Sequence, residues 1–139
     1  MKVERVLAVD PGREKCGVAV VDRQCGALRQ AVVECTQLLV FVKAAIQEYD
    51  CRIVVLGDGT ATDEIKKELS LLLAENIIYQ IIVVDERDST RQARSRYWRA
   101  HPPIGWRKFV PIGLLDPPVT IDDFAAIILA ERYFQCNRF

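Results

Sequence analysis

Several acidic residues stand where apolar runs of the strand-forming type end, or where an apolar helix begins. They are Asp10, Asp58, Glu86 and the adjacent pair Asp122 and Asp123. If the strands that end at Asp10, Asp58 and Glu86 run parallel, their carboxyl ends meet at one edge of a sheet and the acids share a pocket. Carboxylates in one pocket repel each other unless a hard cation neutralises them, and oxygen ligands suit Mg²⁺ or Mn²⁺. Two such ions could activate a water and stabilise the leaving oxygen in phosphodiester cleavage, so the pattern predicts a metal-dependent nuclease.

The first of these acids ends the apolar run Val6 to Val9 and precedes a loop with two glycines. A lone carboxylate is costly to bury, so Asp10 must be paired, protonated or bound to a cation. Gly12 and Gly17 allow a positive φ, or a close approach of another backbone or a phosphate, at the two ends of a tight hairpin. The loop is also similar to the nucleotide phosphate loop of actin and the sugar kinases. Those enzymes need two such domains, and 139 residues are too few for both.

Each acid that follows a strand also has a purely structural interpretation. Asp10, before a Pro-Gly pair, could be a turn residue that bonds its own loop, and Asp58 fits a Gly-Asp-Gly turn. Glu86 is flanked by Asp85 and Arg87 and could be an exposed ion-pair partner. Periodicity alone therefore leaves the shared pocket as a hypothesis.

The two acids of the last helix lie in its first turn, just after a Thr120 cap. There they favour the helix dipole whatever else they do. Asp123 is three residues after the cap, the capping-box position, and is the more structural of the pair. Asp122 shares its side of the helix with Ala125, Ala126 and Leu129, and the small residues there would let it approach the sheet closely. Asp122 is therefore the preferred metal ligand, with Asp123 or Asp58 as further candidates.

Basic residues are concentrated between Arg87 and Lys108, which carry seven basic residues and one acid in a chain of zero net charge. The local charge of +6 predicts one anion-facing surface beside one acidic site. Guanidinium groups next to Tyr97 and Trp98 suit a nucleic-acid backbone with unstacked bases. The alternatives are a solvated arginine-rich helix and aromatics that belong to the core. The candidate nucleic-acid contacts are Lys15, Arg87, Arg91, Arg94, Arg99, Arg107 and Lys108.

Short strands and amphipathic helices must position these residues. Apolar patterning predicts strands over 6–9, 18–20, 27–34, 52–56 and 77–84, and helices from a Thr36 cap to Glu48, over 62–75, from Ser89 or Thr90 to Ala100, and over 121–135. The proline-rich residues 101–120 are predicted to form a loop, ordered or mobile, that could fold over a substrate. This order is that of an α/β fold in which an antiparallel meander of three strands is followed by crossovers onto one mixed sheet.

Length and composition favour a single domain over residues 1–139, since half of the residues are apolar and suffice for one core. The longest apolar stretch is broken by Lys43, and the first residues lack the apolar segment of a signal peptide, so neither a membrane span nor a leader is predicted. Five cysteines without a Cys-x-x-Cys pair disfavour a disulfide framework and a zinc site. They indicate reduced thiols in the cytoplasm, and the oligomeric state stays open.

Three segments together resemble the motifs of the YqgF family, also called the RuvX or RuvC-like resolvase family. They are Asp10 to Ala19, Asp85 to Ala93, and Asp122 to Leu129 with Tyr133 and Phe134. The resemblance implies an RNase H-like fold, in which strands 1 to 3 of a five-stranded mixed sheet are antiparallel and strands 4 and 5 are parallel, with flanking helices. It implies a Holliday-junction-resolvase-like endonuclease, or one that processes the small-subunit rRNA precursor, acting on branched DNA or structured RNA. It also implies that Asp10, Glu86 and Asp122 bind the metal.

The loop after the fourth strand departs from the usual Gly-x-Pro turn of this family. Here residues 57–62 read Gly-Asp-Gly-Thr-Ala-Thr, which looks more like the loop of the YqgF-like domain in the transcription accessory protein Tex. That domain is not established as a nuclease. The alternative function is therefore a catalytically silent nucleic-acid-binding or assembly module. The proline-rich residues 101–120 differ from the short basic linker of the family, so the substrate preference of the family is not assigned to this chain.

Reversing two charges in the basic segment tests its proposed role under either function. Replacing Arg91 and Arg94 by glutamate should weaken nucleic-acid binding, most strongly at low salt, because binding of phosphates by basic side chains releases counterions. The slope of log Kobs against log salt should fall by roughly one for each phosphate that the protein no longer neutralises. Fluorescence anisotropy with labelled RNA and branched DNA at several salt concentrations measures both quantities. Unchanged affinity would show that the basic segment is not part of the surface that binds nucleic acid.

Overall fold

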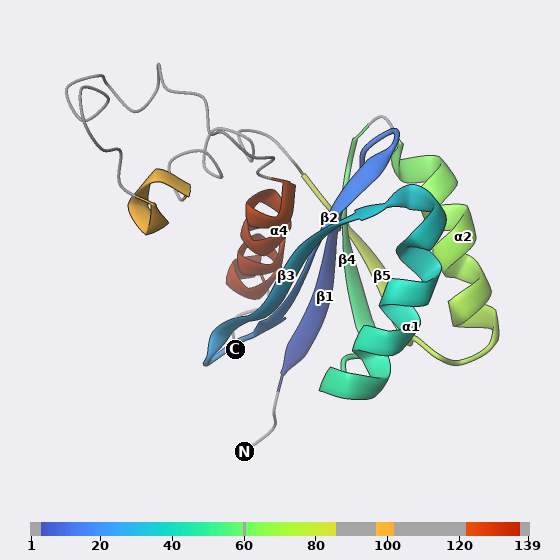
Figure 1. The fold of residues 1–139 in the computed structure, drawn as a ribbon. Coiled ribbons are helices and arrows are strands. Elements are labelled where there is room, and N and C mark those ends of the chain that lie inside the picture. Colours follow the sequence, from blue (N-terminus) through green and yellow to red (C-terminus); the bar gives the residue numbers. More distant parts are fainter. Residues whose placement is uncertain (1–3, 60, 86–96, 102–121, 137–139) are drawn as a thin grey trace.

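A mixed sheet of five strands organises the computed structural model, which describes residues 4–59, 61–85, 97–101 and 122–136 (Figure 1). For residues 122–124 and 136 only the backbone is described. In chain order the elements are β1 (Arg5–Asp10), β2 (Lys15–Asp22), β3 (Gly26–Glu34), the 3₁₀ helix η1 (Cys35–Gln37), α1 (Leu38–Tyr49), β4 (Ile53–Gly57), α2 (Thr62–Ala74), β5 (Gln80–Val84) and α4 (Asp122–Cys136). A further helical turn covers residues 97–100.

The strands lie in the order β3-β2-β1-β4-β5. β1 pairs antiparallel with β2, which pairs antiparallel with β3. On its other side β1 pairs parallel with β4, which pairs parallel with β5. The prediction of an antiparallel meander followed by two parallel strands is confirmed. Because β1, β4 and β5 run in one direction, their carboxyl ends lie at the same edge of the sheet.

The side chains of β1 alternate between two separate cores, one on each face of the sheet. Leu7 and Val9 pack with α1 and α2, whereas Val6 and Ala8 pack with α4, and all four are fully buried. Burial on both faces explains why the run reads as continuously apolar instead of alternating. α1 and α2 therefore cover one face of the sheet and α4 covers the other (Figure 1).

Small side chains let α4 approach the sheet closely. Ala126 and Ala130 of α4 belong to the same buried cluster as Ala8 and Ala19, which are directly paired between β1 and β2. Side chains of one carbon on both surfaces shorten the distance at which a helix and a sheet reach close packing. α4 therefore contacts mainly β2 and β1, the strand that ends at Asp10.

Arg23 fastens the last turns of α4 to the turn that follows β2. Its guanidinium lies over the Phe134 ring, 4.8 Å from the centroid, and its Nη1 donates to the Phe134 carbonyl at 3.4 Å. The Nε of the same side chain pairs with the carboxylate of Glu4. Stacking and hydrogen bonding by one arginine thus join the amino-terminal part of the chain to its last helix.

The predicted start of α1 is wrong. Thr36 lies within η1, and α1 begins at Leu38 after Gln37, whose side chain forms no capping hydrogen bond. The backbone N–H of Cys35 donates to the Glu14 carbonyl at 2.8 Å. This bond extends the ladder between β2 and β3 by one step to Cys35, the first residue of η1, so a 3₁₀ turn separates the sheet from α1.

The predicted start of the fifth strand is also wrong, because residues 77–79 lie in the connection between the end of α2 at Ala74 and the start of β5. The backbone N–H of Ile77 donates to the Leu72 carbonyl at 2.9 Å, and that of Ile78 donates to the same carbonyl at 3.4 Å. β5 starts only at Gln80. The Thr120 cap, the segment 102–120 and most of the predicted arginine-rich helix lie outside the described residues.

None of the helices in the described part of the chain is long and apolar enough to cross a membrane. The cysteines whose side chains are described, at positions 16, 25, 35 and 51, are free thiols.

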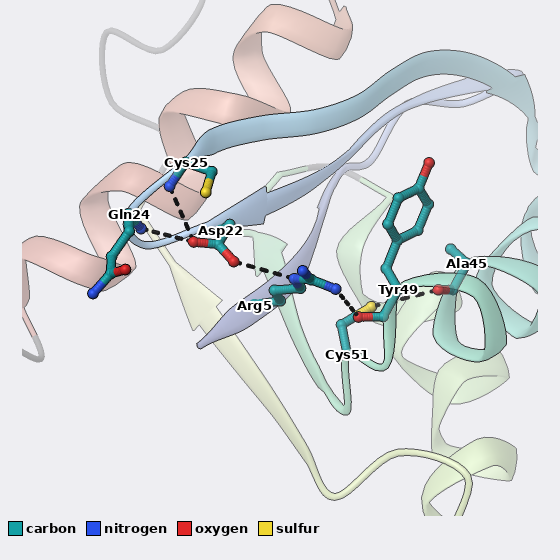
Figure 2. A network of polar contacts seen from close by, with 7 residues as sticks. All are labelled: Arg5, Asp22, Gln24, Cys25, Ala45, Tyr49 and Cys51. Atoms are coloured by element: carbon teal, nitrogen blue, oxygen red, sulfur yellow. Dashed lines mark hydrogen bonds and ion pairs between the residues drawn. The ribbon is translucent and has the colours of Figure 1, made fainter. Parts of the chain in front are cut away.

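The buried carboxylate of Asp22 stabilises the edge of the sheet at which β1 begins, which is opposite the carboxyl edge (Figure 2). Asp22 is 6% exposed and accepts hydrogen bonds from the backbone N–H groups of Gln24 at 2.8 Å and Cys25 at 3.0 Å. Its other oxygen accepts from Arg5 Nε at 3.1 Å, and Arg5 Nη1 donates to the Tyr49 carbonyl at 2.9 Å. The network joins the turn between β2 and β3 to the end of α1. The backbone hydrogen bonds, and then Arg5, lower the pKa of Asp22.

Replacing Asp22 by asparagine should lower the free energy of unfolding by about 2 kcal/mol at neutral pH, since hydrogen bonds to a charged group contribute ~1.5–3 kcal/mol. The pKa of Asp22 in the folded state lies below its ordinary value of 3.8. Its stabilising contribution is therefore complete above that pH and is lost as the pH falls through the lower folded pKa. Asp22→Asn should flatten the acid side of the stability curve, which urea denaturation across the acid range measures.

A matched control is Asp50→Asn. The Asp50 side chain is 87% exposed and its contact with Arg52 Nε is 3.7 Å long. Asparagine also tolerates the left-handed backbone of this residue, whose φ is 53°. The control should change stability by less than about 0.5 kcal/mol. Equal losses in the two variants would contradict a special role for the Asp22 network.

Candidate functional site

Three adjacent parallel strands each end in or next to an acidic residue. Asp10 is the last residue of β1, Asp58 follows β4 and Asp85 follows β5. Register keeps these ends level, because Val9 pairs with Leu56 and the backbone N–H of Asp58 donates to the Val84 carbonyl at 3.0 Å. Glu86, the predicted ligand, is the next residue after Asp85 and lies outside the described residues. The structure therefore gathers acids at the carboxyl edge of the sheet, as the parallel arrangement predicts.

Asp10 lies on the face of the sheet that α4 covers. The alternation that puts Val6 and Ala8 against α4 puts Asp10 on the same side, and the residue is half-buried. Its direct partner on β2 is Gly17, which contributes no side chain beside the carboxylate. An oxygen ligand next to a strand position without a side chain fits a small hard cation and its water ligands. Gly17 lies within β2 but forms the last pair with β1, so it stands at the end of the β1–β2 hairpin, as predicted.

Gly12 is required by a close backbone approach in the loop after Asp10. A Cβ added at this residue would lie 2.2 Å from the Lys15 carbonyl oxygen, well inside contact distance. The loop is also tied to η1, because the Cys35 thiol donates to the Gly12 carbonyl at 3.3 Å. The prediction that Gly12 admits another backbone is confirmed. Residue 12 must therefore be glycine, because the loop leaves no room for a Cβ.

α4 begins at Asp122 and contacts the end of β5 further along its length. The Nη1 of Arg132 donates to the Asp85 carbonyl at 2.6 Å. Ala126, four residues after Asp122, packs against the strands. Among the side chains that the structure describes, no group of three acids, histidines or cysteines is placed to hold a metal. Glu86 and the side chains of Asp122 and Asp123 fall outside that description, so the predicted ligand set stays a prediction.

Asp58 is exposed at the end of β4, and its backbone N–H closes the ladder with β5. In the following loop the Thr62 hydroxyl donates to the Gly57 carbonyl at 2.6 Å and accepts from the backbone N–H of Gly59. The Gly-Asp-Gly segment is thus an ordered turn held by a buried threonine. This geometry agrees with the structural interpretation of Asp58.

The predicted basic contacts are described in part. Lys15 and Arg99 are exposed, at the start of β2 and in the turn 97–100. The others, Arg87, Arg91, Arg94, Arg107 and Lys108, lie outside the described residues. Tyr97 and Trp98 are only 7% and 5% exposed and pack edge to face with ring centroids 5.0 Å apart. Their burial favours the core interpretation over stacking on unpaired bases.

Sequence reasoning missed two side chains that shape this edge of the sheet. Cys35 ties down the Asp10 loop, and Arg132 holds the end of β5 against α4. Nothing in the spacing around Cys35 points to the loop, since the contact depends on how η1 turns away from β3. Arg132 does leave a signal, because it is a charged residue that follows the buried run Ala125 to Ala130 of α4.

The sheet order, the helices on its two faces and the acids at its carboxyl edge define an RNase H-like fold. RuvC of Thermus thermophilus in complex with a Holliday junction substrate has this fold, with a TM-score of 0.57, 13% identity and 95% of each chain covered. The fowlpox virus Holliday junction resolvase is similar, with a TM-score of 0.60, 14% identity and coverage of 95% of this chain and 98% of that chain.

Within this fold the chain belongs to the family of the Tex protein YqgF-like domain, whose family model matches residues 4–97. No curated protein sequence matches the chain. The resemblance to the YqgF family is confirmed, including its closeness to the Tex domain, which residues 57–62 indicate in the sequence.

Substituting Gly12 by alanine should destabilise the protein by about 1–3 kcal/mol, the usual cost of forcing extra atoms into a packed site. The Cβ can only be accommodated if the Lys15 backbone moves, since the contacting atom is a carbonyl oxygen. Denaturant unfolding measures the loss. Gly26→Asn is the control, because Gly26 has a φ of 82° with nothing within 4 Å of an added Cβ. A loss at Gly26 equal to that at Gly12 would contradict the steric argument.

Proposed function

We propose that this chain is a divalent-metal-dependent nuclease that hydrolyses phosphodiester bonds in nucleic acid. The observation that carries the proposal is the parallel placement of β1, β4 and β5, with Asp10 on the α4 face at their common carboxyl edge. Acids at the ends of adjacent parallel strands are a suitable ligand set for Mg²⁺ or Mn²⁺. The RuvC and fowlpox virus neighbours, which are Holliday junction resolvases, support the same class of reaction.

The proposed ligands are Asp10, Glu86 and Asp122, with Asp123 or Asp58 as additional oxygen donors. A bound divalent cation would supply an activated water and would stabilise the charge that develops on the phosphate oxygens. Asp10 would orient that cation from the end of a strand that is hydrogen-bonded on both sides, so its backbone is fixed before substrate binds. Gly17 would leave space beside the carboxylate for a scissile phosphate.

The proposed substrates are branched DNA and structured RNA, including the small-subunit rRNA precursor. Both present a phosphodiester backbone whose charge suits the basic residues between Arg87 and Lys108. Lys15, exposed directly after the Asp10 loop, would contact a phosphate close to the acids. Because Tyr97 and Trp98 are buried, we assign recognition to charge and shape instead of base stacking.

The second candidate function is a catalytically silent nucleic-acid-binding or assembly module. The match to the Tex protein YqgF-like domain over residues 4–97 favours it, because that match ends before the last acidic motif at Asp122. The sequence of residues 57–62, in which Thr62 is hydrogen-bonded to Gly57 and Gly59, replaces the Gly-x-Pro turn of the wider YqgF family and points the same way. The two candidates differ in a single observable, which is metal-dependent cleavage.

Removing the central acid separates the two candidates. The intact protein should cleave four-way DNA junctions or structured RNA with Mg²⁺ or Mn²⁺, and Asp10→Asn should lower the rate by about 100-fold or more, as expected for loss of transition-state charge stabilisation. Omitting the metal or adding EDTA should abolish cleavage in both proteins. Denaturing gel electrophoresis of end-labelled substrates measures the rates.

Asp50→Asn is the matched control, because Asp50 is an exposed acid that precedes β4 at the opposite edge of the sheet. It should retain the rate of the intact protein. Binding without cleavage on every substrate, with either metal, would favour the silent module. Equal rates for Asp10→Asn and the intact protein would exclude Asp10 as the metal ligand.

A further inference from the structure

Two thiols lie in contact beside the loop that follows Asp10. The Sγ atoms of Cys16 and Cys35 are 3.3 Å apart. Cys16 is fully buried in β2, whereas Cys35 is half-buried at the first position of η1. The separation exceeds the ~2.05 Å of a disulfide by little more than 1 Å. The two sulfurs are thus already in contact in the reduced protein.

Backbone pairing places Cys16 and Cys35 as diagonal neighbours on adjacent segments. Cys16 pairs with Val33, and the N–H of Cys35 donates to the Glu14 carbonyl at 2.8 Å, which continues the ladder beyond β3. Both cysteines pack against the cluster that α1 and α2 cover. The contact is thus built into the pairing of two strands. The other described cysteines differ, since Cys25 is exposed and the Cys51 thiol points to the Ala45 carbonyl at 3.9 Å.

We propose that Cys16 and Cys35 form an oxidative modification site that takes a low-molecular-weight disulfide as its oxidant. The half-buried Cys35, as the thiolate, attacks one sulfur of the oxidant, forms a mixed disulfide and releases one thiolate. Cys16 then attacks the Cys35 sulfur and its proton passes to the departing small thiolate, which forms the intramolecular disulfide and releases the second thiol. Two protein thiols are oxidised and one small disulfide is reduced to two thiols.

The order of the two attacks follows from burial. Burial raises the pKa of the Cys16 thiol to about 12, so it stays protonated while it is surrounded by the core. Cys35 is the partner that a small disulfide can reach, because it is half-buried on the side of the loop. Cys16 reacts only with a sulfur that is already next to it.

Oxidation would change the loop that carries Asp10. In the reduced protein the Cys35 thiol donates to the Gly12 carbonyl at 3.3 Å, and it also lies 3.6 Å from the Arg13 carbonyl. A disulfide sulfur has no hydrogen to donate, so these hydrogen bonds break when the disulfide forms. The loop between Asp10 and Lys15 then loses the thiol hydrogen bonds at Gly12 and Arg13, and of its hydrogen bonds with Cys35 the backbone one at Glu14 remains. Its effect on metal binding rests on the proposed function, whereas disulfide formation does not.

Peptide mapping tests the site directly. The folded full-length protein is incubated with oxidised glutathione, quenched with acid and an alkylating agent, and digested with trypsin. We expect the intact mass to fall by two hydrogens and peptides 16–23 and 30–43 to be linked. Peptides 24–29 and 44–52, which carry Cys25 and Cys51, should stay out of the link. Dithiothreitol should restore both free peptides.

Cys35→Ser should abolish the linked peptide, and Cys25→Ser should leave its yield unchanged. A circular dichroism spectrum of each variant checks that it is folded. A stable glutathione adduct on Cys35 without the link, or a link that forms only in denaturant, would overturn the proposal.

Amide hydrogen exchange tests the coupling to the loop without any activity measurement. Exchange at Arg13 to Lys15 should be several-fold to about tenfold faster in the oxidised protein, the range expected for loss of one hydrogen bond. Amides of α2 serve as the internal reference. Unchanged exchange in the loop would overturn the coupling, even if the nuclease proposal holds.

Discussion

The hydrogen bonding of β1 on both sides is the constraint on which the rest of the fold depends. The strand has an antiparallel neighbour in β2 and a parallel one in β4, and its side chains are buried on both faces. A strand enclosed in this way cannot shift by one residue without exchanging its two sets of apolar side chains between the cores. That fixed register determines that Asp10, and neither of its neighbours, faces α4 at the end of the strand.

α4 is positioned by contacts that lie far from its first residue. Arg23 bonds to Phe134 near one end of the sheet, and Arg132 donates to the Asp85 carbonyl. Ala126 and Ala130 lie close to β1 and β2. Because a helix is stiff, these contacts fix where its first turn lies relative to the strands. The position of Asp122 is thus set by residues that carry no chemistry of their own.

Most of the sheet could be predicted from the sequence because each strand is an apolar run bounded by turn residues. The meander, the two parallel strands and their common carboxyl edge all follow from that pattern. At both boundary errors, Thr36 and residues 77–79, the backbone bonds a residue far away in the sequence, from Cys35 to Glu14 and from Tyr79 to Arg52. Local propensity contains no information about such bonds.

The same limit applies to the site. The acids could be found because carboxylates at strand ends stand out in an apolar sequence, and Gly12 could be found because glycine has few other reasons to be there. The tie from Cys35 to the loop depends on the path of η1. The burial of Tyr97 and Trp98 likewise depends on tertiary packing, which a count of nearby arginines does not reveal.

The contact between Arg23 and Phe134 joins residues 111 positions apart, and it has a consequence for how the chain folds during synthesis. The face that α1 and α2 cover is completed by segments that emerge early from the ribosome, whereas the opposite face stays open until α4 is made. A long stretch of the translated chain therefore carries an exposed apolar surface over β1 and β2. Contacts of such high sequence separation also slow folding. The α4 face of the sheet, on which Asp10 lies, is therefore covered only when translation of the helix is finished.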